Sequence, residues 1–323
     1  MSIPGFRPLL LRVFTRDGRL HPLWRVFFYL VTYVTANLVI QVSVVFPYFF
    51  YKLMIGASPA DVGRALLGGP SPSLLEFFLT VLSFGAVLGI TYLFRRFLDR
   101  ASFVTLGFRR RRVKSDMVFG ILLGFVLMAG LFFAEWGAGL LAVEHKRWDG
   151  AVAITAVYNV SISLLFFIVA AANEEIVFRG YLIPNLEEEI NKIAAVIVSS
   201  LVFGAFHVLN PHANLIAIIN IALAGAVFAY AYLSSGNLWL PIAFHFAWNF
   251  FQGAVFSLPV SGLVMRGLLI THPRPGFDLI TGGAFGPEAG LSGFIALVLA
   301  CVCLRLWSRA GVQDAGRSEA GGQ

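Results

Sequence analysis

The stretch from Ile193 to Met265 contains no Asp, Glu, Lys or Arg, and it constrains the fold more than any other feature of the chain. A soluble fold needs a polar shell, yet only 13% of the 323 residues are charged and 58% are hydrophobic, against about 25% charged in an ordinary soluble domain. The sequence therefore predicts that most of the protein surface faces lipid.

The apolar runs can be counted as membrane spans, because a helix needs roughly 20 apolar residues to cross the bilayer core. Asn210-Pro211 and the Ser-Ser-Gly-Asn sequence at 234–237 divide the long stretch into three spans. Five further runs without charged residues are Val26–Tyr51, Phe77–Phe94, Met117–Ala134, Gly150–Asn173 and Ala289–Leu304. The sequence thus predicts an all-α polytopic membrane protein with about eight transmembrane helices around an intramembrane catalytic cavity.

The expected organisation is a single membrane domain with short ends. Residues 1–25 form a cytoplasmic N-terminal lead-in, residues 26–308 form the eight-helix domain, and residues 309–323 form a disordered tail. Gly120 and Gly124 have the spacing of a close helix–helix contact.

The distribution of basic residues predicts the orientation. Eighteen of the 24 Lys and Arg residues fall on the side of the two termini, including the cluster Arg109–Arg112, and six fall on the other side. Because cytoplasmic loops carry the excess of Lys and Arg, we expect a cell-membrane protein with both termini in the cytoplasm. The net charge of +7 then reflects topology, and we expect no nucleic-acid partner. The sequence carries no signal for an oligomeric state.

Few ionisable residues enter the predicted spans, and such residues are functional candidates because they are costly in lipid. Glu174 and Glu175 end the fourth span. Glu175 lies four residues before Arg179, so the two can form an ion pair on one helix face. Glu174 is left without a helical charge partner and is a candidate base.

Two histidine motifs follow on later spans. His207 lies four residues after Phe203, and His245 lies four residues before Asn249. Each motif alone is more often structural, since a buried histidine can bond a backbone carbonyl and an asparagine can join two helices. Together with the glutamates they supply what peptide hydrolysis needs, namely an activated water and a clamp for an oxyanion.

The three motifs Glu-Glu-x-x-x-Arg, Phe-x-x-x-His and His-x-x-x-Asn, in this order between residues 174 and 249, resemble those of the CPBP family (CAAX protease and bacteriocin-processing, or Abi) of intramembrane proteases. Prenyl-protein proteases of the Rce type belong to this family. The resemblance covers roughly Leu164 to Gln252, and the eight-span layout is also similar. The stretch Leu279–Gly290 looks like a loop of bacterial members, and no chemistry is assigned to it.

The resemblance implies an intramembrane endopeptidase that acts on a membrane-associated protein or peptide. It implies that Glu174 and His207 activate the attacking water and that His245 and Asn249 stabilise the oxyanion. Glu175 and Arg179 would support the first motif.

The family is often labelled metalloprotease, and Glu174, His207 and His245 could make a three-ligand zinc site. We expect no cofactor, since the chain lacks a His-Glu-x-x-His motif, and keep zinc as the alternative. Two other functions remain open, a proton-coupled transporter in which Glu and His relay protons and a catalytically silent scaffold or immunity protein.

Helix geometry predicts different membrane depths for two of the candidate residues. At 1.5 Å per residue, His207 would lie deeper in the membrane than Glu174. We therefore expect tilted helices or a break near Gly204 to bring the two together, in a cavity that opens to the cytoplasm.

Overall fold

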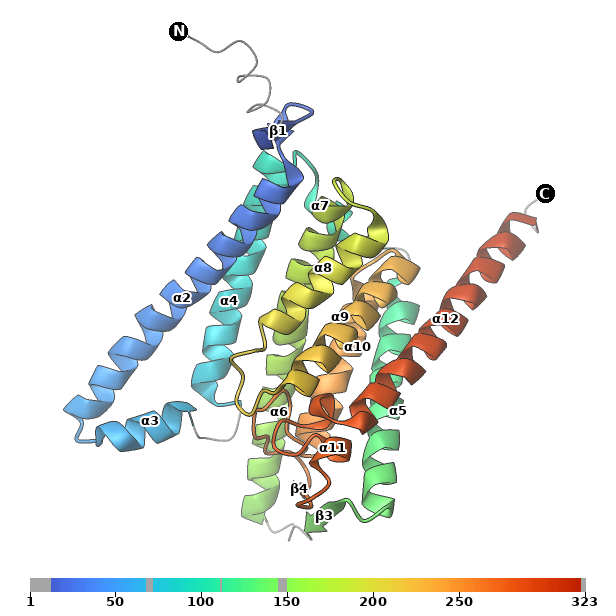
Figure 1. Cartoon of the computed structure of the whole chain (residues 1–323). Helices are drawn as coiled ribbons and strands as arrows, with labels where there is room; N and C mark the ends of the chain where they lie inside the picture. The colour runs from blue at the N-terminus through green and yellow to red at the C-terminus, as the bar shows by residue number, and fades with distance from the viewer. Residues whose placement is uncertain (1–12, 68–71, 111, 145–149, 321–323) are drawn as a thin grey trace.

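The computed structural model describes residues 13–67, 72–110, 112–144 and 150–320, and most of these are helical. The longer helices run as a bundle (Figure 1), and large apolar side chains such as Leu38, Phe46 and Val126 are exposed on their outer faces. The prediction of an all-α polytopic membrane protein is confirmed. The helices are α2 (Pro22–Met54), α3 (Pro59–Leu67), α4 (Leu74–Leu93), α5 (Val113–Gly137), α6 (Gly150–Glu175), α7 (Ile183–Glu187), α8 (Lys192–Ala205), α9 (Leu215–Ser235), α10 (Trp239–Phe250), α11 (Asp278–Thr281) and α12 (Leu291–Ala320).

Short turns and two small hairpins complete the described chain. Strand β1 (Thr15–Arg16) pairs antiparallel with β2 (Arg19–Leu20), and β3 (Leu141–Glu144) pairs antiparallel with β4 (Ile270–Pro273). The non-α helical turns are η1 (Phe94–Leu98), η2 (Phe103–Leu106), η3 (Ile176–Leu182), η4 (Phe251–Val255) and η5 (Pro287–Ala289), of which η1, η3 and η4 are π-helical.

The count of eight crossing helices is not confirmed. In the described parts of the chain, six helical segments are long and apolar enough to cross a membrane: residues 22–54, 74–98, 113–137, 153–187, 215–235 and 291–309. Two of the three spans predicted within the uncharged stretch are not among them: α8 has 14 residues, and α10 has 12 before it continues as the five-residue π-helical turn η4. At 1.5 Å per residue the α-helical parts extend about 21 Å and about 18 Å. Composition could not reveal this, since the turns that end both helices are apolar too.

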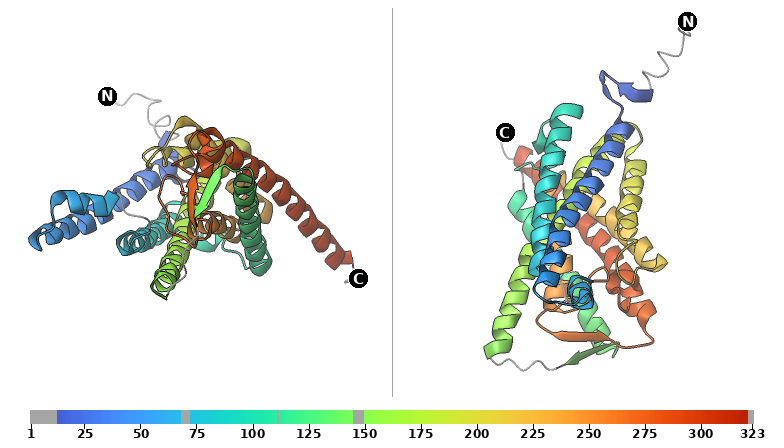
Figure 2. Two further views of the ribbon diagram at one scale, coloured as in Figure 1. Left: turned by 90° about the horizontal axis from the view of Figure 1, so that it is seen from below. Right: turned by 90° about the vertical axis from the view of Figure 1, so that its left-hand side faces the viewer.

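The beginning of α2 and the end of α12 lie at the same end of the bundle, while the β3–β4 hairpin and α11 lie at the other (Figure 1). Seen along the bundle, α2 and α12 occupy opposite sides (Figure 2). Helix α12 continues to Ala320, through most of the segment for which the sequence predicts disorder. Of the predicted N-terminal lead-in, residues 1–12 lie outside the described residues, and residues 13–25 include the β1–β2 hairpin and the start of α2.

A buried ion cluster joins elements at the end where α2 begins. Arg25 and Asp99 are almost inaccessible, and Arg25 Nη1 lies 2.7 Å from Asp99 Oδ1. Arg95 Nη1 lies 2.9 Å from Asp99 Oδ2, and Glu188 accepts a further bond from Arg25. In the sequence, Arg25 and Arg95 served only to predict the orientation. In the fold they also connect α2 and η1 to the segment after α7.

Helix α10 is at the centre of the arrangement that matters for function, because it packs against α5, α6 and α9. The contact with α5 depends on two glycines, as the Gly120 and Gly124 spacing predicted. A Cβ on Gly120 would lie 2.9 Å from the carbonyl oxygen of Leu240, and one on Gly124 would lie 2.6 Å from Ala247 Cβ. The backbones of α5 and α10 can approach this closely only where no side chain intervenes.

Gly124→Ala should therefore destabilise the protein. The added methyl meets backbone and Cβ atoms of α10, and such overpacking costs about 1–3 kcal/mol. Gly130→Ala is the matched control, because it lies on the same helix with no atom within 4 Å of the added Cβ and alanine favours a helix by about 1 kcal/mol. Thermal unfolding in detergent should show a lower Tm for Gly124→Ala and an equal or higher Tm for Gly130→Ala. Equal Tm values for the two variants would contradict this packing.

Candidate active site

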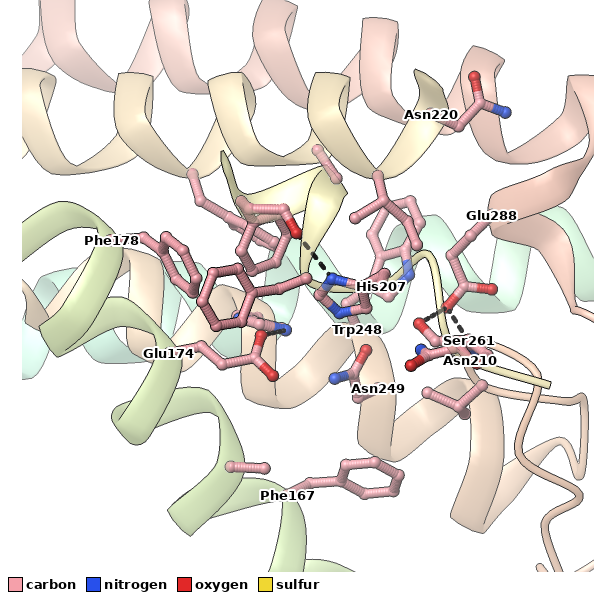
Figure 3. Close-up of a pocket in the computed structure, with 18 of the residues that line it drawn as sticks. Phe167, Glu174, Phe178, His207, Asn210, Asn220, Trp248, Asn249, Ser261 and Glu288 are labelled. Atoms are coloured by element: carbon pink, nitrogen blue, oxygen red, sulfur yellow. Dashed lines mark hydrogen bonds and ion pairs between the residues drawn. The ribbon is translucent and has the colours of Figure 1, made fainter. Parts of the chain in front are cut away.

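All four candidate catalytic residues line one cavity of about 330 Å³. Its walls come from α6, α8, α9, α10, the turn after α8 and the segments that follow α10 (Figure 3). The lining residues include Glu174, His207, His245 and Asn249 together with Tyr33, Phe167, Phe178, Phe203, Phe228, Trp248, Asn210, Asn220, Ser261 and Glu288. The structure thus brings together residues from all three motifs. The sequence alone predicted no contact between one motif and another.

The glutamate pair sits where the regular helix changes. Helix α6 ends at Glu175 and the chain continues directly as the π-helical turn η3, all of whose side chains are buried. Pro184 in α7 has no N–H to donate to the carbonyl of Gly180, four residues earlier. Ser199 on α8 donates to the carbonyl oxygen of Phe178 at 2.7 Å. One backbone carbonyl of η3 thus has its hydrogen-bond donor on a neighbouring helix. Such π-helical turns are frequent at functional sites.

Glu175 lies behind the cavity wall and connects two of the sequence motifs. Its side chain is fully buried, and its Oε1 atom accepts hydrogen bonds from Arg179 Nη1 at 2.9 Å and from His245 Nδ1 at 2.8 Å. The ion pair predicted from the four-residue spacing is confirmed. The bond to His245, 70 positions away, is a contact that sequence reasoning missed.

Arg179 contacts two helices, α8 and α9, in addition to Glu175. Its Nη2 atom donates to the carbonyl oxygen of Gly225 on α9 at 2.9 Å, and its guanidinium lies 4.4 Å from the ring centroid of Phe203. A guanidinium over an aromatic face gains a cation–π attraction that is larger when water is excluded. Arg179 therefore joins η3 to α8 and α9 while it neutralises Glu175.

The orientation of His245 follows from this bond. Because Nδ1 faces the Glu175 carboxylate, it carries a proton, and the Nε2 atom is left to face Glu174 at 3.8 Å from Oε2. The ring also stacks on Phe228, with centroids 4.5 Å apart and planes 18° apart. Glu174 Oε2 is buried and accepts no hydrogen bond from the described residues.

His207 stands in the turn directly after α8, which ends at Ala205. The helix thus ends next to Gly204, where a break was expected, and His207 and Glu174 line the same cavity. Its Nδ1 atom lies 2.8 Å from the carbonyl oxygen of Phe203, and since a carbonyl only accepts, Nδ1 is the protonated nitrogen. The four-residue spacing of Phe203 and His207 thus leaves Nε2 as the free nitrogen.

Asn249 lies one turn after His245 on α10 and borders the cavity between Glu174 and Ser261 (Figure 3). His245 and Asn249 therefore lie on one helix and line the same cavity, as their four-residue spacing predicted. Its neighbour along the helix, Trp248, is 4% exposed and forms another part of the wall.

The far wall of the cavity contains polar residues to which the sequence assigned no role. Glu288 in η5 is buried; its Oε2 atom accepts from Gln252 Nε2 at 2.8 Å and its Oε1 atom accepts from the Ser261 amide at 3.3 Å. Burial raises the pKa of Glu288 to about 7. The only available signal was a carboxylate directly before the last apolar run, in the loop resembling that of bacterial family members.

The zinc alternative requires Glu174, His207 and His245 to converge on one point. In the ranges that the structure describes, no group of three or more His, Cys, Asp or Glu side chains is placed to hold a metal ion. Glu174, His207 and His245 share a cavity without forming such a group. Both histidines bond through Nδ1, to the Phe203 carbonyl and to the Glu175 carboxylate, and so keep Nε2 without a hydrogen bond to the described residues, as metal-ligating histidines usually do.

Comparison with known proteins gives one positive result. Residues 156–251 match the family model described as type II CAAX prenyl endopeptidase Rce1-like. No curated protein and no solved structure shows a significant match to the chain. The matched range contains all three motifs, so this segment of the multi-pass membrane protein is similar to the Rce1-like type II CAAX prenyl endopeptidases, as the motifs predicted.

Proposed function

We propose that the protein is an intramembrane endopeptidase that hydrolyses a peptide bond in a membrane-associated protein or peptide. The observation that carries this proposal is the chain of contacts from Arg179 through Glu175 and His245 to Glu174, at the edge of a cavity that also holds His207 and Asn249. The match to a CAAX-type endopeptidase family supports the same reaction class.

Glu174 is the proposed general base. Its buried Oε2 atom has no hydrogen bond to the described residues, so it is available to a water molecule in the cavity. The unprotonated Nε2 atom of His207 gives that water a second acceptor. The water oxygen then attacks the carbonyl carbon, Glu174 takes the proton, and it later donates this proton to the leaving amine as the C–N bond breaks.

His245 and Asn249 are the proposed oxyanion donors. For His245 to donate from Nε2, the imidazole must be protonated at both nitrogens. The Glu175 carboxylate, 2.8 Å from Nδ1, stabilises that positive charge, much as the carboxylate of a catalytic triad orients its histidine and stabilises the imidazolium. A preorganised donor pair of this kind stabilises the negative charge of the tetrahedral intermediate.

We also propose that both termini lie in the cytoplasm. The beginning of α2 and the end of α12 share one end of the bundle (Figure 1), and the segment Arg109–Arg112 precedes α5 at the helix end from which the chain enters the membrane. Eighteen of the 24 basic residues belong to this side by the sequence count, which is the distribution expected of a cytoplasmic face.

Glu174→Gln should abolish proteolysis while the protein stays folded. Loss of a positioned general base lowers a rate by about 10²–10⁴-fold, and glutamine has nearly the same shape. The measurement is cleavage of fluorogenic membrane-inserted peptides by the reconstituted protein. Glu144→Gln, at a 63% exposed side chain on β3, is the matched control and should cleave at the wild-type rate. No cleavage by any of the three proteins would favour a transporter or a scaffold. Equal cleavage by all three would remove Glu174 as the base.

Chelation tests the metal alternative separately. A reaction that uses Glu174 and His207 without metal should proceed at an unchanged rate in the presence of a zinc chelator such as 1,10-phenanthroline. Elemental analysis of the purified protein accompanies the assay. Stoichiometric zinc that is lost in His207→Ala, with activity removed by chelator and restored by zinc, would replace the glutamate mechanism.

A further inference from the structure

The cavity that holds the candidate catalytic residues is acidic and strongly aromatic. Glu174 lies at one end and Glu288 at the other (Figure 3), and none of the described residues that line it is Lys or Arg. The nearest guanidinium in the site, that of Arg179, is engaged by Glu175 and the Gly225 carbonyl. The described lining therefore brings no Lys or Arg charge to the space between the two carboxylates, and the His245 imidazolium of the proposed mechanism faces Glu174, with Nε2 3.8 Å from Oε2.

The carboxylate of Glu288 is buried among neutral partners. The side chain of Gln252 and the amide and hydroxyl of Ser261 bond its two oxygens. These bonds hold it in place, but they leave its charge without a counter-ion from the described residues. A buried charge without a counter-ion is costly, and a cation that enters the cavity would offset that cost.

The neighbouring polar groups also offer acceptors. Asn210 donates its Nδ2 group to the carbonyl oxygen of Ser261 at 3.1 Å, and Asn220 donates its Nδ2 group to the carbonyl oxygen of Gly290 at 3.1 Å. With both amide nitrogens turned to the backbone, the Oδ1 atoms of the two side chains remain as acceptors. This wall suits a ligand group that donates several hydrogen bonds.

Two of the aromatic rings of the lining are already in use. Phe203 and Phe228 have the Arg179 guanidinium 4.4 Å and 5.3 Å from their ring centroids, and the His245 ring stacks on Phe228. Trp248 lines another side. Aromatic faces attract organic cations most strongly where water is excluded.

We propose that the Glu288 end of the cavity binds a cationic side chain of the substrate, a lysine or an arginine close to the bond that is cleaved. The inference rests on the proposed function, because it describes the peptide that the same cavity would hydrolyse. Glu288 is then a specificity-determining residue, held in position by Gln252 and Ser261, and Glu174 at the opposite end is free for the chemistry.

The test is a binding comparison between peptides that differ in one charge. The probes are otherwise identical hydrophobic peptides that carry lysine, norleucine or glutamate at each of several successive positions; norleucine has the four-carbon chain of lysine without the ammonium group. Binding is measured at pH 8, where Glu288 is largely ionised because its pKa is about 7. The full-length protein is held in nanodiscs of uncharged phosphatidylcholine, so that lipid charge does not attract lysine.

All binding measurements use the Glu174→Gln background, in which no peptide is hydrolysed. At one position or more, the lysine peptide should bind about tenfold tighter than the norleucine peptide, as expected for a charge-assisted hydrogen bond, and the glutamate peptide should bind weakest. Adding Glu288→Gln should bring the lysine-to-norleucine ratio close to one. Adding Glu144→Gln should leave the ratio unchanged. Glutamine at position 288 keeps an acceptor for Gln252, and an unchanged Tm verifies that the variant folds.

Equal affinities of the lysine and norleucine peptides at every position would overturn the inference, as would a lysine preference that survives Glu288→Gln, or no binding by any peptide. Cleavage by the wild-type protein separates this result from the proposed function. Equal cleavage of lysine and norleucine peptides would remove the cationic subsite and leave the protease intact. A Glu288-dependent lysine preference without any cleavage would keep the subsite and remove the protease.

Discussion

The buried carboxylate of Glu175 is the interaction on which the rest of the site depends. One oxygen atom accepts bonds from Arg179 and His245, and so it joins the end of α6, the π-helical turn η3 and the middle of α10. Removing one partner of such a buried pair costs about 3–5 kcal/mol, because the other charge is left uncompensated. The same bonds fix which nitrogen of His245 faces the cavity. Stability and chemistry are therefore coupled at this one carboxylate.

The surrounding backbone makes this arrangement possible through close approaches and short helices. Gly225 brings α9 near enough to α8 that a Cβ there would lie 3.2 Å from Ser200, and its carbonyl is free to accept from Arg179. Helix α8 stops at Ala205 and leaves His207 in a turn inside the bundle. The turn that carries His207 lines the same cavity as Glu174 on α6. The short helix that reduced the number of spans is thus also the one that assembles the site.

Local periodicity was enough to predict part of the site. The spacings within Glu175–Arg179, Phe203–His207 and His245–Asn249 are four residues each, so a helical repeat alone places the members of each pair together. The ion pair and the Phe203 contact follow this rule. The close packing at Gly124 was visible for the same reason.

Contacts between distant segments were not predictable in this way. The bond from Glu175 to His245 spans 70 positions, and the bond from Gln252 to Glu288 spans 36. Glu288 stands in a loop whose sequence resembles ordinary turn chemistry, and only the fold brings it to the cavity. The number of full-length spans also depended on where α8 and α10 end, which their uniformly apolar sequence does not reveal.

A double-mutant cycle between Glu175 and His245 tests the central claim most directly, with the rate of cleavage of a membrane-inserted peptide as the readout. If Glu175 acts on the reaction through His245, Glu175→Gln and His245→Asn will each lower kcat/KM, and the double variant will be little worse than His245→Asn alone. Additive losses in the double variant, or a wild-type rate in Glu175→Gln, would contradict the account.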